Sequence, residues 1–235
     1  MNKLSAEPVD GQGDAMTEGR IWFPGNPWPD GHRVAEFQWK GRLSPEDGAG
    51  FGFSLKSAPY DEDDRAELDG EEDHPFGGGR ATWRNYGWTT IDAMQGFVAG
   101  TPDEPLDFGR LSEREFHVDP LDQVAEYEDH DDYAFHVYLL GHDSVADHRI
   151  RFPVRQAPFR FDIAWNGRVA LTYIGETEFE YEFRARVSAA DFTGFELPRD
   201  LNDDDAQALL ARCVRDADAF RLDDRGSVRR FVPAT

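Results

Sequence analysis

The chain has 235 residues, 13% of them aromatic and 31% charged, and its formal net charge is −22. This aromatic content excludes a disordered chain and predicts a globular protein with a sizeable core. The negative charge disfavours nucleic acid and anionic membranes as partners, because both require a basic surface, and it favours a basic protein. Genome composition or salt adaptation would explain the same charge without any partner.

Cys213 is the single cysteine, so the chain can form no intramolecular disulfide and no cysteine-based zinc site. The first residues contain no apolar signal-peptide core, and no apolar run approaches the roughly 18 residues of a transmembrane helix. We therefore expect a cytoplasmic protein.

Residues 1–19 are small, polar and aperiodic, and they predict a disordered tail ahead of a domain that spans residues 20–198. After a short first strand, Trp28 lies in a loop rich in proline and glycine, where it either plugs the end of the core or offers a binding aromatic. Alternating apolar residues then predict a hairpin of strands at 35–40 and 51–56, joined by a turn around Ser44 to Gly48.

The acidic segment 59–80 interrupts this pattern. It fails the EF-hand calcium template, because Arg65 occupies a ligand position and Ala66 replaces the obligatory glycine. We expect a solvated loop with no bound metal, although the sequence leaves calcium binding open. Trp83 and Trp88 follow in an aromatic and polar mixture that either fills the core or stacks on sugars.

Residues 133–140 are apolar on both faces and predict a central strand. Four histidines around it have an even six-residue spacing that matches no metal signature: His130, His136, His142 and His148. We expect His136 to be the buried, hydrogen-bonded histidine and the other three to lie in loops, with no metal and no cofactor. In the next strand, 148–154, Arg149 and Arg151 share one face, opposite Ile150.

The clearest pattern runs from Pro158 to Val187 and predicts three consecutive antiparallel strands. A two-residue turn at Asn166-Gly167 would mix apolar and polar side chains on each face. We therefore predict three-residue turns at 165–167 and 175–177, which pair Phe161 with Leu171 and give all three strands one apolar face.

The opposite face of these strands is polar, with small residues at its floor and charges at its sides. It is either a solvated surface or a shallow binding groove. The candidate binding residues are those of this face together with three tryptophans: Arg160, Asp162, Thr172, Glu178, Glu180, Glu182, Trp28, Trp83 and Trp88.

The six residues Glu178-Phe179-Glu180-Tyr181-Glu182-Phe183 resemble the Glu-x-Asp-x-Glu-Phe strand of the lichenase-type β-glucanases. The resemblance implies a jelly-roll fold and a retaining glycosidase, with Glu178 as the nucleophile and Glu182 as the acid/base. Glu180 stands where that family has aspartate.

Residues 199–222 predict a helix that Asn202 or Asp203 caps, with an apolar stripe that includes Cys213 and extends to Phe220. This helix should pack on the sheet, and residues 223–235 should form a tail.

Together these patterns predict one all-β domain, an antiparallel β-sandwich of the jelly-roll type with a C-terminal helix packed on it. No catalytic triad, phosphate-binding loop or dinucleotide fingerprint is present. We therefore expect a protein-binding module rather than an enzyme, for example of the inhibitor or immunity type, which masks a basic partner protein. The alternatives are a carbohydrate-binding or glycoside-hydrolysing domain that uses Glu178, Glu180 and Glu182, and a purely structural role.

Overall fold

The computed structural model describes residues 18–26, 28–60 and 87–234. The expected tail up to Thr17, most of the acidic segment and Trp83 lie outside the described residues. The strands of the described part are β1 (Gly19–Trp22), β2 (His32–Ser44), β3 (Gly48–Ser57), β4 (Thr90–Ala93), β5 (Phe97–Gly100), β6 (Glu115–Val118), β7 (Phe135–Tyr138), β8 (His142–Ala157), β9 (Arg160–Ala170), β10 (Tyr181–Glu196), β11 (Phe220–Asp223) and β12 (Arg230–Pro233). The helices are α3 (Leu121–Val124), α4 (Asp203–Cys213) and the 3-10 turns η1 (Phe108–Glu113), η2 (His130–Asp132), η3 (Thr172–Ile174) and η4 (Ala217–Ala219).

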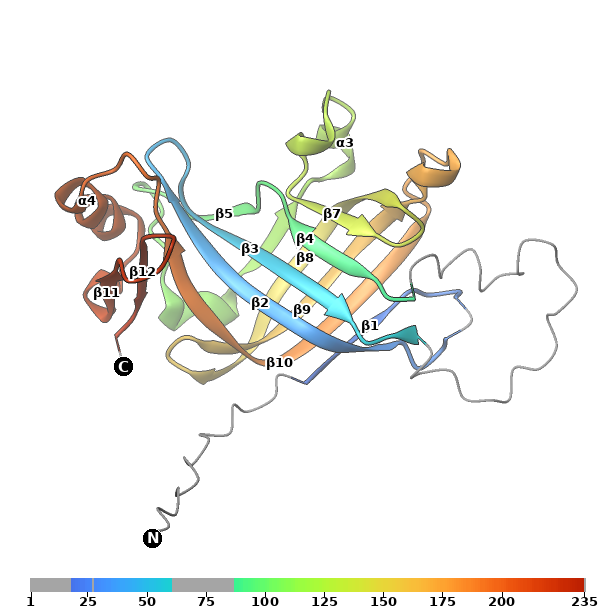
Figure 1. Cartoon of the computed structure of the whole chain (residues 1–235), viewed down its shortest axis with the longest axis horizontal. Helices are drawn as coiled ribbons and strands as arrows, with labels where there is room; N and C mark the ends of the chain where they lie inside the picture. Colours follow the sequence, from blue (N-terminus) through green and yellow to red (C-terminus); the bar gives the residue numbers. More distant parts are fainter. Residues whose placement is uncertain (1–17, 27, 61–86, 235) are drawn as a thin grey trace, which may run out of the picture.

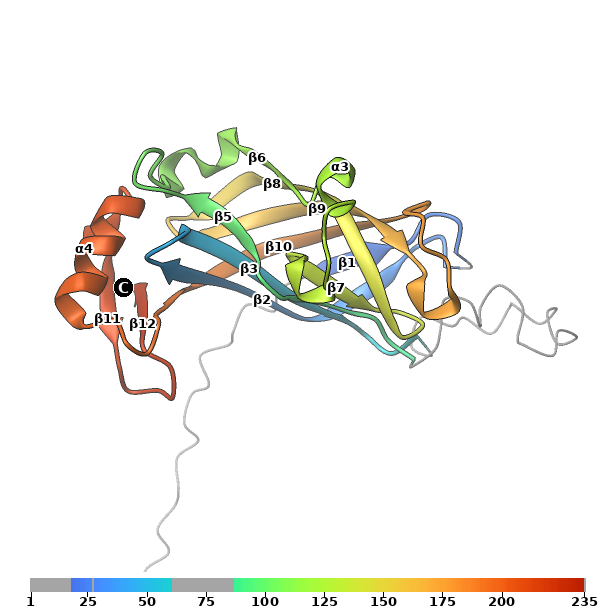
Figure 2. The same ribbon diagram turned by 90° about the horizontal axis from the view of Figure 1, so that it is seen from above.

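Hydrogen bonds join these strands in one twelve-stranded sheet with the order β1-β2-β3-β4-β7-β8-β9-β10-β12-β11, with β5 on β3 and β6 on β8. Because β10 also pairs with β1 and with β2, the sheet closes on itself (Figures 1 and 2). The predicted all-β, mostly antiparallel class and the C-terminal helix are confirmed. The two layers expected of a sandwich are opposite walls of this one sheet.

Aromatic side chains fill the space between the walls, and Trp39 of β2 lies at their centre. Its side chain is fully buried. Six phenylalanine rings from β3, η1, β8, β9 and β10 have their centroids 4.9 to 6.4 Å from its ring: Phe51, Phe53, Phe108, Phe152, Phe161 and Phe192. Trp39 thus packs against both walls at once, and such aromatic contacts stabilise a core beyond the area that they bury.

The hairpin of β2 and β3 has the predicted turn, with Ser44 paired to Gly48. Trp28 is only 5% exposed and packs against His32 and Tyr60, at ring distances of 5.0 and 5.3 Å. Trp28 therefore plugs the core rather than offering a binding surface.

The C-terminal region covers one end of the closed sheet (Figure 1). Asn202 caps α4, as predicted, by accepting from the backbone of Asp205, and Cys213 is buried. The predicted extension of the helix to Phe220 is wrong, because Val214 leaves the helix and forms a β-bridge with Leu106. The expected tail contains β12, which pairs with the end of β10.

The predicted turn at 165–167 is wrong, because β9 runs straight through Asn166-Gly167. β8 pairs with one side of β9 and β10 with the other, so the strand has partners along its whole length. Phe161 therefore lies opposite Ala190 and not Leu171. Trp165, expected in the turn, is 1% exposed and part of the core.

The predicted alternation itself is confirmed, since Phe161, Ile163 and Val169 of β9 and Phe183 of β10 are all buried. The chain does reverse at the second predicted turn, 175–177, but the loop is longer than three residues, since it begins with η3 and Tyr181 pairs with Val169. Gly175 has a φ of 89°, a left-handed conformation that favours glycine.

A β-bulge in β8 decides which residues of that strand face outward. The pairing passes from Ala146 opposite Arg168 to Arg149 opposite Asn166, so Asp147 and His148 together face Gly167. The extra residue turns His148 into the core and Arg149 outward. Gly167 makes room for the imidazole, because a Cβ there would lie 2.7 Å from His148 Nδ1.

His148 is therefore buried, at 0% exposure, whereas His136 is only half-buried, so the expectation for His136 is wrong. The indole Nε1 of Trp165 donates to His148 Nδ1 at 3.2 Å, so the proton of the neutral ring lies on Nε2. Asp119 Oδ2 is 4.0 Å from Nε2, too far for a hydrogen bond. Burial lowers the pKa of His148 to about 3, which keeps the ring neutral.

The pH dependence of folding tests this burial. Since the folded pKa of about 3 lies below the unfolded value of about 6.5, the unfolded chain binds a proton first, and the contribution to stability is lost as the pH falls below 6.5. The free energy of unfolding in urea should fall by about 1 kcal/mol from His148 alone between pH 7 and 5.5. Burial raises the pKa of Asp119, so protonation of this carboxyl group stabilises the folded state at lower pH and opposes the effect of His148. The comparison therefore stops at pH 5.5.

The readout is the difference between variants. His148→Phe should remove this part of the pH dependence, whereas His142→Phe, at an exposed position, should retain it. Equal pH dependence in the wild type and in His148→Phe would contradict the assignment.

Closure of the sheet can be tested at Gly41 of β2, where a Cβ would lie 2.4 Å from Phe195 Cδ1 and 2.7 Å from Phe192 Cζ. Both rings are buried. Gly41→Ala should therefore lower the free energy of unfolding by about 1 to 3 kcal/mol. Gly226→Ala is the control, because the nearest atom to its Cβ would be 3.7 Å away; equal stability of the two variants would contradict the tight crossing.

Candidate functional site: an arginine strip on the outer sheet face

Arginines occupy the outward positions of five neighbouring strands. On these strands, inward residues such as Ile21, Ile150 and Ala185 are buried, so the residues that flank them point outward. We call the set the arginine strip: Arg33 on β2, Arg20 on β1, Arg184 and Arg186 on β10, Arg168 on β9, and Arg149 and Arg151 on β8.

The register places several of these arginines directly beside one another. Arg20 lies opposite Arg33 on one side and opposite Arg186 on the other. Arg186 lies opposite Ala164, which in turn lies opposite Arg151. Since neighbouring strands are about 4.8 Å apart, the backbones at Arg186 and Arg151 are about 10 Å apart, with the small Ala164 as the floor between them.

Carboxylates partly neutralise the sides of the strip. Four of its arginines form exposed ion pairs: Arg149 with Asp147 at 3.7 Å, Arg151 with Glu115 at 3.4 Å, and Arg168 and Arg184 with Glu182 at 3.9 and 3.1 Å. Exposed pairs of this kind contribute little to stability.

The centre of the strip has no such neutralisation. Within the described residues, no carboxylate lies within 4.0 Å of the guanidinium of Arg20 or Arg186. Arg186 Nη1 has only the Asn166 side-chain oxygen at 3.4 Å and the Ala185 carbonyl at 3.2 Å. Burial, and then the positive charges of Arg151 and Arg184, lower the pKa of Arg186. A cationic centre thus persists on a protein whose net charge is −22.

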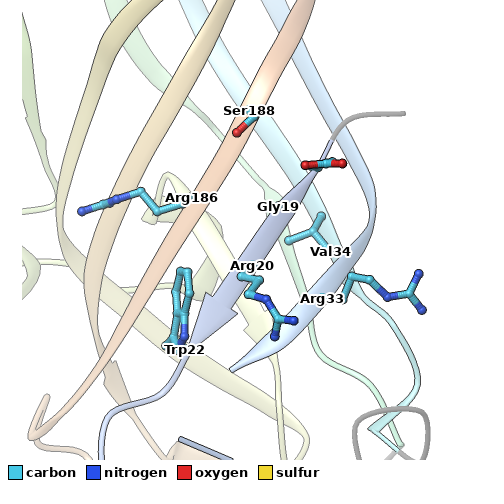
Figure 3. A pocket seen from close by; sticks show the side chains of 8 residues that line it. Gly19, Arg20, Trp22, Arg33, Val34, Arg186 and Ser188 are labelled. Atoms are coloured by element: carbon cyan, nitrogen blue, oxygen red, sulfur yellow. The ribbon is translucent and has the colours of Figure 1, made fainter. Parts of the chain in front are cut away.

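Two shallow hollows meet at Arg186. The first has a volume of about 490 Å³ and is lined by three arginines, one carboxylate and four other residues: Arg20, Arg33, Arg186, Glu18, Gly19, Trp22, Val34 and Ser188. Figure 3 shows the ring of Trp22 with Arg186 on one side of it and Arg20 on the other. The second, of about 430 Å³, is lined by Arg149, Asn166, Arg168, Glu182, Arg184 and Arg186, among others.

The site residues predicted at the start of β9 have roles in the sheet. Arg160 forms two hydrogen bonds of 2.7 Å with Asp191 of the neighbouring strand. Asp162 accepts from the backbone of Ala189 at 2.9 Å, in a bulge of β10 where Ala189 has a φ of 53°. Thr172 lies in η3 and donates to the carbonyl of His142. These residues do not form the single polar face that the predicted register implied.

The glutamate string is not a continuous strand either. Glu178 and Glu180 precede β10, which begins at Tyr181, and the amide of Glu180 donates to the carbonyl of Glu178 at 2.9 Å. The strand that the β-glucanase resemblance requires, with Glu178 and Glu182 on one face, is therefore not formed. Of the three glutamates, Glu182 is the one that contacts the arginine strip.

Of the other predicted aromatics, Trp88 is 41% exposed, and Lys56 Nζ lies 5.2 Å from its ring centroid. Trp83 lies outside the described residues. Neither the buried Trp28 nor Trp88 lines the hollows at Arg186. The aromatic residues that do so are Phe183, in the second hollow, and Trp22, in the first, which the sequence placed only in a short first strand.

In the described part of the chain, no group of three or more His, Cys, Asp or Glu side chains could hold a metal ion. No helix of that part is long and apolar enough to cross a membrane.

Comparisons with models of known protein families, with curated proteins and with solved structures find no match for this chain.

Proposed function

We propose that the protein is a binding module that recognises an anionic ligand through the arginine strip. The observation that carries this proposal is Arg186, which lies opposite Arg20 and within the field of Arg151 and Arg184. Among the described residues it has no carboxylate partner.

Like charges directly opposite each other destabilise a sheet, so the repulsion between these arginines does not serve folding. A bound anion would turn the repulsion into charge-assisted hydrogen bonds. The planar guanidinium group suits carboxylate and phosphate, because its donors match the spacing of two oxygens.

The overall negative charge is compatible with such a site. At physiological ionic strength, exposed charges more than about 8 Å apart are largely screened. A ligand in contact with Arg20 and Arg186 therefore responds to the local arginines more than to the distant carboxylates.

Masking of a basic partner protein, as an inhibitor or immunity-type protein does, is a second candidate. One observation favours it: the loop around α3 carries six exposed carboxylates and stands out from the sheet (Figure 1). They are Asp122, Glu126, Glu128, Asp129, Asp131 and Asp132.

Replacing Arg186 tests the first candidate. Arg186→Gln should weaken the binding of inorganic pyrophosphate, measured by calorimetry at low salt, by about tenfold or more, because hydrogen bonds to a charged group contribute about 1.5 to 3 kcal/mol. Arg225→Gln is the matched control, since this exposed arginine lies outside the strip and is paired with Asp223 at 2.8 Å. No pyrophosphate binding, or equal losses in both variants, would refute the proposal.

The same variant separates a binding role from a structural one. Because Arg186→Gln removes a repulsion, its free energy of unfolding should equal or exceed that of the wild type. A clear loss of stability would show that Arg186 supports the sheet.

For the second candidate, the probe is an oligolysine peptide. The triple variant Glu126→Gln, Glu128→Gln, Asp129→Asn should weaken its binding several-fold more than Asp200→Asn, Asp204→Asn, Asp218→Asn, which changes the net charge equally at exposed positions outside the loop. Equal effects would mean that the peptide senses only the overall charge.

A further inference from the structure

We infer that the hollow beside Trp22 binds a ligand in which a planar aromatic ring is joined to a phosphate or carboxylate group. This inference rests on the anion recognition proposed above and specifies the class of ligand.

Trp22 offers a ring surface that is held in place. It is half-buried on the outer face of β1, opposite Arg184 of β10. Gly31 packs against its edge so closely that a Cβ there would lie 2.4 Å from Trp22 Cδ1. Gly31 has a φ of 67°, a conformation that favours glycine. A ring fixed in this way loses little conformational freedom when a ligand stacks on it.

The same loop also holds Arg20. Its Nη1 donates to the carbonyls of Asp30 and Gly31, at 3.0 and 3.2 Å. Neither carbonyl carries a net charge, so the guanidinium keeps its full positive charge. Its Nε and Nη2 donors have no hydrogen bond within the described part of the chain, which leaves them for an anion.

The spacing of these groups suits a ring that carries an anionic substituent. Arg20 and Trp22 are two residues apart on one face of β1, which is about 7 Å along a strand, and Arg186 lies directly opposite Arg20. The side chains of Arg186 and Arg20 extend to opposite sides of the Trp22 ring (Figure 3), so an anionic substituent on a ring stacked there would meet a guanidinium group on either side. Ser188 also lines the hollow and adds a hydroxyl donor.

Size and polarity narrow the class further. A hollow of about 490 Å³ has the volume of sites for small molecules. A neutral aromatic ligand would leave the charge of Arg186 without a counterion, and an anion without a ring would leave the exposed part of Trp22 in contact with water. A molecule with both parts uses both surfaces.

Calorimetry with three probes tests this inference: 1-naphthyl phosphate, inorganic phosphate and 1-naphthol. The naphthyl ester should bind about tenfold or more tightly than inorganic phosphate, which is the gain expected from one stacked ring. Naphthol should bind more weakly than the ester. Arg186→Gln should weaken the binding of both phosphates.

Variants of Trp22 separate stacking from charge. Trp22→Leu should remove the advantage of the naphthyl ester and leave inorganic phosphate unchanged, whereas Trp88→Leu, an exposed tryptophan outside the hollow, should change neither. If the leucine variant does not fold, Trp22→Phe takes its place. This variant keeps a smaller ring and should bind the naphthyl ester with intermediate affinity. In the wild type, the Nε1–H resonance of Trp22 should shift on addition of the ester.

The outcomes distinguish the two proposals. If phosphate binds through Arg186 but the ring adds no affinity, the inference about Trp22 is wrong and the proposed function stands. Equal losses for both phosphates in Trp22→Leu would also overturn the inference. If neither phosphate binds, both proposals fail.

Discussion

The pairing of β10 with strands on both of its sides is the constraint on which the rest of the structure depends. On one side it follows β9, and on the other it meets β1 and then β2, which closes the sheet. Closure brings the two walls together around Trp39 and buries its ring. The same closure places Arg20 opposite Arg186, so the core and the arginine strip follow from one set of backbone hydrogen bonds.

The charge of this protein has to be considered by position rather than as a sum. A net charge of −22 suggests repulsion of anions, yet seven arginines share one outer face because strand alternation and the bulge at His148 turn them outward together. Carboxylates at the sides of the strip limit the positive field to its centre, at Arg20 and Arg186. The small anion that we propose would bind at this local site, whereas the cationic partner of the second candidate would bind at the acidic loop around α3, and the two surfaces need not compete.

The fold class, the β2–β3 hairpin and the inward residues of β9 and β10 could be predicted because each depends on a period of two along the chain. Register could not be predicted in this way, since a shift by two residues preserves the pattern. Asn166-Gly167 carries a turn signal that the tertiary structure overrides, because β8 and β10 pair along the whole of β9. For the site, the alternation of Arg149 with Ile150 and of Arg184 with Phe183 was visible. That these arginines lie beside Arg20 could not be predicted, because β1 and β10 are far apart in the sequence and no local pattern indicates that they pair.

The distance along the chain between the closing strands also has a consequence for biosynthesis. Thr193 Oγ1 donates to the carbonyl of Trp39 across 154 residues, so the sheet cannot close until most of the chain has left the ribosome. Until then β1 and β2 present an unpaired edge, and exposed edges of this kind are where chains associate wrongly. Contacts this distant in sequence also make folding slow. Early in synthesis the nascent protein can form only the pairings of β2 with β1 and with β3, and a hairpin alone is marginally stable in water.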